Sequence, residues 1–183
     1  MLTTARFGRA DLELTRGDIT AQPDLEAVVN AANARLTTGG GVAGAIHQAA
    51  GPGLDRACRP LAPIAPGEVV ATDAFGLPNR RVLHALGPVY GRDEPAEVLL
   101  AECYRRALEL AVAEGLQSIG FPALSTGAFG YPLRPAAEVA LTTARDVLAA
   151  GSPLRLVRFV LFSSGDLDVH AEVLAAIAGA ESG

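Results

Sequence analysis

Two glycine-rich segments, 39-GGGVAG-44 and 125-STGAFG-130, have the residue types needed to bind an anion. A backbone without large side chains can point several N–H groups at one ligand, and the start of a helix adds its positive dipole. The first segment opens a helical pattern, and the second lies between an apolar run and the next helical pattern. Two such loops facing each other predict a diphosphate site, whereas either loop alone could be a tight turn in which glycine supplies a positive φ.

Gly39, Gly41 and Gly44 also match the G-x-G-x-x-G pattern of dinucleotide-binding folds. That fingerprint directly follows the first strand of its unit, and an acidic residue follows about 20 residues later. Here residues 34–38 separate the glycines from the preceding strand-like run, and no strand ending in an acid follows at that distance. A nicotinamide-dependent dehydrogenase is therefore disfavoured.

Three further polar segments, 17-GDIT-20, 30-NAAN-33 and 162-FSSGD-166, each come directly after an apolar strand-like run. Ligands of open α/β sheets bind at the carboxyl ends of the strands. We therefore expect these segments and the two glycine-rich loops to converge on one site.

The elements that must position these segments alternate along the chain. The expected strands, rich in β-branched or alternating apolar residues, are 11–18, 25–33, 67–75, 81–87, 117–124 and 155–162. The expected helices, with apolar residues at helical spacing, begin at Val42 or span 95–114, 137–148 and 167–180. This order predicts an α/β fold, a three-layer α/β/α sandwich with a central mixed, mostly parallel sheet. A single domain over residues 1–183 is expected.

The composition excludes several classes of function. All 15 basic residues are arginine, so Schiff-base lysines and Walker-A lysines are excluded. The net charge is −5 and no basic run is present, so nucleic-acid binding is not expected. The absence of lysine, with many Ala, Arg, Gly and Pro residues, suggests a GC-rich bacterial genome.

Neither the cysteines nor the histidines have the spacing of a metal site. Cys58 and Cys103 form no disulfide framework and are expected to be buried thiols. His47, His84 and His170 show no ligand spacing, so no metal is expected, and His84 has the surroundings of a core histidine. The N-terminus has no signal peptide and no apolar run approaches about 20 residues, so we expect a cytoplasmic protein without membrane contact.

Five segments together resemble the signature blocks of macrodomains, most closely those of the MacroD-type branch. They are GDIT (17–20), VVNAAN (28–33), GGGVAGAIHQAAG (39–51), LPNRRVLHALGP (77–88) and FPALSTGAFGYP (121–132). They occur in the family's order and spacing over nearly the whole chain. The residues alone predict only a diphosphate-binding α/β domain, whereas the resemblance implies that ADP-ribose and mono-ADP-ribosylated proteins are the partners, without a cofactor.

The resemblance also implies roles at the adenine end of the ligand. Asp18 matches the acid that accepts a hydrogen bond from the adenine amino group, and Ile19 matches its neighbour on the same base. Phe162 matches an aromatic ring that stacks against adenine, a contact worth about 1–3 kcal/mol. The alternatives are an Asx turn at Asp18 and core packing of Phe162.

At the other end, Asn33 resembles the amide that holds the distal ribose, with Asn30 supporting it, although both amides could instead stabilise the loop. Phe129 resembles the ring that closes over the distal ribose and diphosphate. The loop residues that match the diphosphate-binding pair are Gly39, Gly40, Gly41, Val42, Ser125, Thr126, Gly127 and Ala128.

The chain departs from the MacroD-type pattern at one position. The usual GGGVDGAIH is GGGVAGAIH here, so Ala43 replaces the loop aspartate, while His47 is retained one helical turn later. His47 could face the site or could make a local hydrogen bond within its helix.

The resemblance implies hydrolysis of mono-ADP-ribose esters on acidic side chains, or of O-acetyl-ADP-ribose, by a water that the substrate phosphate activates. The residues assigned to catalysis on this basis are Asn33, Gly40, Gly41, His47 and Phe129. Since Ala43 removes the usual acid, the alternative is a module that recognises ADP-ribose without turnover.

Overall fold

The computed structural model of this chain describes residues 1–180, and residues 181–183, at the end of the expected domain, lie outside the described part. One sheet of seven strands, in the order β1-β2-β7-β6-β3-β5-β4, forms its centre. The strands are β1 (Thr4–Phe7), β2 (Ala10–Arg16), β3 (Ala27–Ala31), β4 (Val69–Asp73), β5 (Arg81–Ala85), β6 (Ser118–Phe121) and β7 (Leu156–Leu161).

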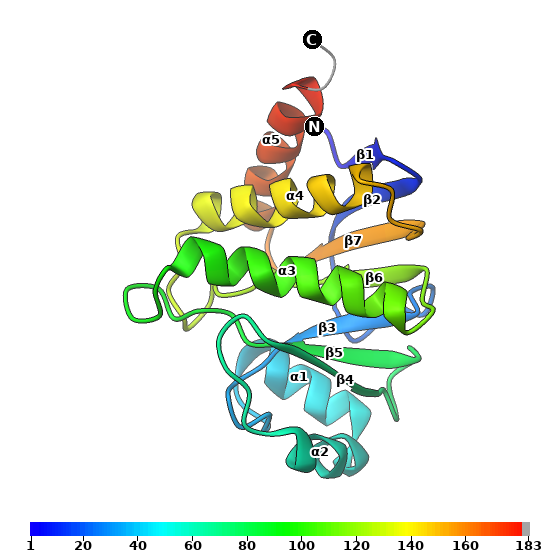
Figure 1. The fold of residues 1–183 in the computed structure, drawn as a ribbon, viewed down its shortest axis with the longest axis vertical. Coiled ribbons are helices and arrows are strands. Elements are labelled where there is room, and N and C mark those ends of the chain that lie inside the picture. Colours follow the sequence, from blue (N-terminus) through cyan, green and yellow to red (C-terminus); the bar gives the residue numbers. More distant parts are fainter. Residues whose placement is uncertain (181–183) are drawn as a thin grey trace.

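Helices cover both faces of this sheet (Figure 1). They are α1 (Gly41–Ala50), α2 (Pro52–Cys58), a short 3-10 helix (Arg59–Leu61), α3 (Ala96–Ala113), α4 (Leu133–Ala149) and α5 (Ser164–Ala180). Buried residues of α3, α4 and α5 share one core with the sheet, and those of α1 and α2 share a second core on the opposite face. The predicted α/β/α sandwich is confirmed.

The direction of the strands determines where the polar segments meet. The four central pairings, β2–β7, β7–β6, β6–β3 and β3–β5, are parallel, and the two outer pairings, β1–β2 and β4–β5, are antiparallel. The predicted mixed, mostly parallel sheet is therefore confirmed. The carboxyl ends of these five parallel strands lie along one edge of the sheet. The polar and glycine-rich segments come after the strands, at this edge.

The expected strands and helices are all found, but the sequence did not predict β1, α2 or the short 3-10 helix. β1 has only four residues and pairs at the sheet edge, too short for a periodic signal. α2 has only seven residues and starts with Pro52, so it is too short to show a helical periodicity. Its Pro52 occupies the first helical turn, where a missing N–H costs nothing.

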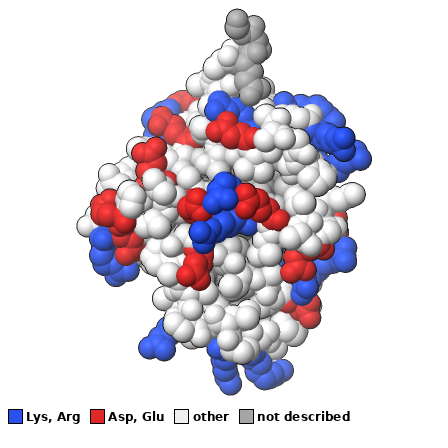
Figure 2. All heavy atoms as spheres, in the orientation of Figure 1, with Lys and Arg blue, Asp and Glu red and all other residues white. Residues whose placement is uncertain are grey.

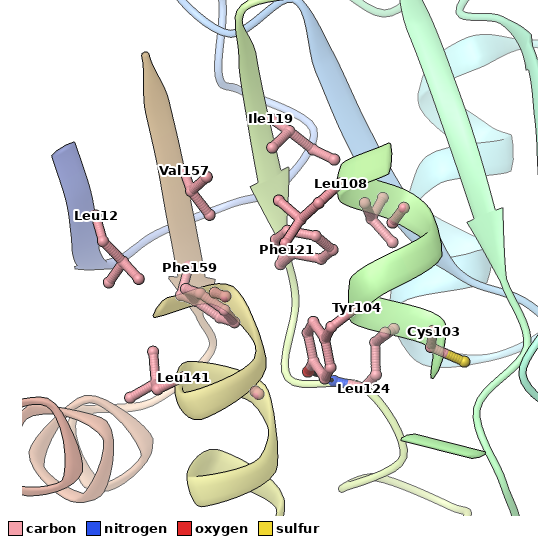
Figure 3. Close-up of a cluster of buried hydrophobic side chains, with 14 of the residues drawn as sticks. Leu12, Cys103, Tyr104, Leu108, Ile119, Phe121, Leu124, Leu141, Val157 and Phe159 are labelled. Atoms are coloured by element: carbon pink, nitrogen blue, oxygen red, sulfur yellow. Dashed lines mark hydrogen bonds between the residues drawn. The ribbon is translucent and has the colours of Figure 1, made fainter. Parts of the chain in front are cut away.

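The larger core fixes the chain that enters the second glycine-rich loop. Tyr104 of α3 packs against Phe121 and Phe159, with ring centroids 5.1 and 5.8 Å away (Figure 3). Its buried hydroxyl donates to the Pro122 carbonyl at 3.4 Å and accepts the Leu124 N–H at 3.0 Å. A buried tyrosine hydroxyl needs such partners, and here they hold the backbone between β6 and the loop.

A buried polar network lies in the second core, beneath α1 and α2. The Thr72 hydroxyl donates to the Asp73 carbonyl at 2.9 Å, so it accepts from His84 Nε2 at 2.9 Å. His84 Nδ1 is then free to accept from the Asn30 amide at 3.1 Å. His84 is the core histidine that the sequence predicted. Cys58 is buried at 3.8 Å from its Nε2.

The charges that Figure 2 shows on one face lie mostly in pairs of opposite sign, with no basic stripe. The pairs of the chain include Arg105 with Glu109 on α3 at 2.9 Å and Arg158 with Glu13 at 2.8 Å. Within residues 1–180, no helix is both long and apolar enough to cross a membrane. Cys103 is buried as expected, and burial raises the pKa of its thiol to about 12.

We expect the network to make stability depend on pH. Burial, with a smaller contribution from nearby His47, lowers the pKa of His84 from 6.5 to about 4. The unfolded chain binds this proton more readily, so the stabilisation is complete above about pH 6.5 and is lost as the pH falls towards 4. At about pH 5 the loss is about 2 kcal/mol.

Urea unfolding of the wild type and of His84→Gln at about pH 7.5 and 5 measures this effect. The stability advantage of the wild type should shrink by about 2 kcal/mol at the lower pH. An equal advantage at both pH values would contradict the assignment of a neutral, buried His84.

Candidate binding cavity

The two glycine-rich loops line one cavity of about 370 Å³ at the carboxyl edge of the sheet. This volume lies within the range of about 300–1,000 Å³ found for ligand sites. The lining residues are Ala31, Ala32, Asn33, Gly39, Gly40, Gly41, Val42, Ala43, Gly87, Ala123, Leu124, Ser125, Gly127, Ala128 and Phe129. The convergence expected for residues after β3 and β6 is therefore observed.

The start of α1 supplies N–H groups to this cavity. The helix begins at Gly41, with Gly40 as its N-cap and no side chain capping it. Gly44 is the first residue whose N–H bonds back along the chain, to the Gly40 carbonyl at 3.3 Å. The N–H groups of the first helical turn have no partner within the helix, and they carry the positive end of its dipole. Since these residues line the cavity, an anion there can accept from them.

At Gly40 and Gly127, backbone conformation does not explain why the residue is glycine, but a position in the cavity wall does. Gly40 and Gly127 have no positive φ, and a Cβ at either position would meet no atom within 4 Å. Neither the chain geometry nor close packing therefore requires glycine there. Gly41 differs, because its φ of +58° is a left-handed conformation. The alternative that these loops are only tight turns thus accounts for Gly41 but not for Gly40 or Gly127.

Ser125 occupies an unusual position in the second loop. Its φ is +67°, and its hydroxyl is buried without a hydrogen-bond partner. A Cβ on Gly87 would lie 2.1 Å from Ser125 Oγ, so the loop after β5 requires glycine to let the serine approach. Buried polar groups without partners are uncommon, and this one belongs to a residue of the cavity wall.

Asn33 lines the cavity and also holds its own loop together. Its amide donates to the Thr37 carbonyl at 3.0 Å, and its Oδ1 accepts the Thr37 N–H at 3.1 Å. The loop-stabilising alternative is therefore present in the structure. Because the side chain also lines the cavity, these bonds fix the orientation in which it faces a ligand.

Asn30 and His47 do not line this cavity. Asn30 is buried against His84, with its Oδ1 lacking a partner, so it supports the end of β3 from the second core. His47 is 6% exposed and its Nε2 has no hydrogen-bond partner, so the alternative of a local bond from this atom is not observed. His47 lines a separate cavity beyond Gly39.

The adenine-end residues lie at the ends of β2 and β7, outside the cavity described above. The Gly17 N–H bonds to the Leu161 carbonyl at 3.0 Å, which places Asp18 and Phe162 on neighbouring strand ends. Phe162 is 90% exposed, so the core-packing alternative is wrong. Ile19 is buried in the second core beside Asp18.

Asp18 forms the Asx turn that the sequence left open. Its Oδ1 accepts both the Thr20 N–H at 2.9 Å and the Thr20 hydroxyl at 2.7 Å. These hydrogen bonds lower the pKa of the carboxyl group, so it stays ionised as an acceptor.

In the second loop, Gly127, Ala128 and Phe129 line the cavity together with Ser125, whereas Thr126 does not. The Thr126 hydroxyl donates to the Ala123 carbonyl at 2.9 Å and so stabilises the turn. Phe129 is half-buried against the second core. Sequence reasoning missed Gly87 and Leu124, although both follow strands whose carboxyl ends reach this edge, and that position was the available signal.

Comparison with known proteins identifies the family. The Macro domain family model matches residues 29–140, which include both loops. The chain is 43% identical over 168 residues to the O-acetyl-ADP-ribose deacetylase of Klebsiella pneumoniae, covering 89% of this chain and 95% of the relative.

The chain belongs to the macro domain family.

Solved macrodomains have the same fold. The Oceanobacillus iheyensis macrodomain with ADP superimposes with a TM-score of 0.94 at 40% identity, covering 97% of each chain. The Trypanosoma brucei macrodomain in complex with ADP-ribose gives a TM-score of 0.83 at 42% identity, covering 88% of this chain and 68% of that one.

The cavity of this macrodomain contains no ionisable side chain. Ala43 contributes only a methyl group to the wall, and the remaining lining residues are glycine, apolar, Asn33 or Ser125. Within residues 1–180, no group of three His, Cys, Asp or Glu side chains is placed to hold a metal ion. An anion bound here would be met by N–H dipoles and not by side-chain charge.

We expect Ser125→Ala to leave the free energy of unfolding unchanged within about 0.5 kcal/mol, or to raise it, because the hydroxyl has no protein partner to lose. Gly87→Ala should destabilise the macrodomain by about 1–3 kcal/mol, because its Cβ would overlap Ser125. Urea unfolding of both variants provides the comparison. A loss above about 1 kcal/mol for Ser125→Ala would show that its hydroxyl has a structural role.

Proposed function

We propose that this macrodomain binds ADP-ribose and hydrolyses mono-ADP-ribose esters on acidic side chains of proteins, and also O-acetyl-ADP-ribose. The main support is the single cavity in which two glycine-rich loops and the start of α1 face a ligand without any side-chain charge. A diphosphate fits such a wall because its oxygens accept from backbone N–H groups. The name of the Klebsiella pneumoniae relative supports the proposed reaction.

The sheet order supports an extended ligand along the carboxyl edge. Asp18 and Phe162 lie at β2 and β7, and the diphosphate loops follow β6 and β3, in the order of the strands. In our proposal, Asp18 accepts from the adenine amino group and Phe162 stacks on the base. Asn33 and Phe129 then hold the distal ribose at the far end of the cavity.

The proposed step is water attack on the distal anomeric carbon of a 1″-linked ester. The water oxygen bonds to this carbon, and the bond from the carbon to the ester oxygen breaks, releasing the carboxylate. A phosphate oxygen of the substrate takes the proton of the water. Gly40 and Gly41 place the water, while Asn33 and Phe129 restrain the sugar, so catalysis depends on geometry and oriented dipoles.

One observation favours a second candidate, a module that binds ADP-ribose without turnover. Ala43 lines the cavity where MacroD-type relatives usually carry an aspartate, and no other lining residue can act as a base. His47 does not replace this acid, because it lines a different cavity. Turnover of a carboxyl ester therefore depends on the good leaving group and the substrate's own phosphate.

We expect Gly127→Glu to weaken ADP-ribose binding at least tenfold more than Gly127→Gln, a difference of about 1.4 kcal/mol. The two side chains have the same size, and a Cβ at Gly127 meets no atom within 4 Å, so they differ mainly in charge. The added carboxylate would repel the diphosphate. Titration calorimetry with ADP-ribose measures both constants, and equal constants would place the diphosphate elsewhere.

We also expect the wild type to release free ADP-ribose from a protein modified on glutamate, at a rate that varies less than about threefold between about pH 6.5 and 8.5. The flat profile follows from a cavity without an ionisable side chain. Loss of label, corrected for spontaneous hydrolysis, provides the measurement. Binding without release would establish the non-catalytic alternative, and a bell-shaped profile would implicate a titrating residue outside the cavity.

A further inference from the structure

A second cavity, of about 580 Å³, lies on the other side of Gly39 from the cavity described above. The loop after β3 provides Thr38 and Gly39, α1 provides one side, and the start of α2 provides the other. The lining residues are Thr38, Gly39, Gly44, His47, Gln48, Gly51, Pro52 and Asp55. Gly39 lines both cavities, so the two adjoin at this residue.

His47 lines this cavity from the buried face of α1. The residue is only 6% exposed, and its Nε2 makes no hydrogen bond within the described chain. Burial lowers the pKa of His47, and nearby Asp55 partly offsets this effect, so the ring is uncharged near neutral pH. Because its Nε2 is enclosed by protein, the groups open to a ligand in this cavity are those of the other lining residues.

The rest of the wall also favours hydrogen bonding over apolar contact. Thr38, Gln48 and Asp55 offer a hydroxyl, an amide and a carboxylate, and Pro52 is the only large apolar residue among the lining side chains. The Asp55 carboxylate is paired with Arg59 at 2.7 Å, so this part of the wall carries no net charge. Peptide groups, which need both donors and acceptors, fit this set.

We propose that the second cavity receives the polypeptide next to the ADP-ribosylated residue of a protein substrate, an inference that rests on the proposed function. The distal ribose is the part of ADP-ribose that is joined to its target, so a protein substrate must continue beyond the first cavity. O-Acetyl-ADP-ribose has no such extension. The second cavity therefore distinguishes protein substrates from the small ester.

The test is a bulky substitution, Gln48→Trp, compared with Ala49→Trp. Both residues are exposed on α1, but only Gln48 lines the second cavity. Gln48→Trp should raise KM at least about tenfold for a protein carrying mono-ADP-ribose on glutamate. The Kd for free ADP-ribose and kcat/KM for O-acetyl-ADP-ribose should change less than about twofold, and Ala49→Trp should leave all three constants unchanged.

An unchanged KM for the protein substrate in Gln48→Trp would overturn the inference. An equal loss for the protein and for the small ester would also overturn it, because the second cavity would then belong to the small-ligand site. If the wild type binds without turnover, the same comparison applies to the Kd values of the modified protein and of free ADP-ribose. Failure of the wild type to bind ADP-ribose would instead overturn the proposed function on which the inference rests.

Discussion

The parallel pairing of β3 with β5 on one side and β6 on the other is the constraint on which the cavity depends. Ala27 pairs with Arg81 in β5 and with Ile119 in β6, so all three strands run in the same direction and end at the same edge. The loops that follow them therefore meet although they are far apart in sequence. The buried Tyr104 hydroxyl adds a local restraint, because it bonds to both Pro122 and Leu124 where the second loop begins.

This arrangement produces a binding surface that carries no side-chain charge. The chain contains no lysine, and its acidic balance of −5 would repel an anion over most of the surface. The N–H groups at the start of α1 overcome this only at short range, since the effect of a helix terminus falls off within the first turn. Glycine at positions 40 and 127 keeps these groups accessible. The affinity and the chemistry of the macrodomain thus depend on backbone geometry.

Because Ala43 stands where the usual acid would be, the cavity wall supplies no base, and the proposed reaction depends on the substrate's own phosphate. In the proposed reaction, the macrodomain contributes orientation and dipoles, and a phosphate oxygen of the ligand receives the proton. His47 remains one helical turn away but lines the other cavity. In our proposal, the first cavity binds the nucleotide part of the substrate and the second receives the protein part.

The sequence by itself determined the order and type of most elements, because hydrophobic periodicity is a local property that these residues carry in any context. It also indicated both glycine-rich loops and the position of Ala43. The sequence did not determine which face each side chain occupies. Asn30 and Asn33 read alike, yet the strand pairing buries the first against His84 and leaves the second in the cavity wall.

Tertiary packing likewise decides whether Phe162, Ile19 and His47 are exposed, buried or in a cavity wall. Phe162 ends an apolar strand but is exposed, Ile19 lies beside Asp18 but is buried, and His47 lies beyond Gly39. The elements β1 and α2 were missed because four and seven residues carry too little periodicity to be read. Local pattern determines what a segment becomes, whereas the neighbours of a side chain depend on long-range pairing that only the folded chain establishes.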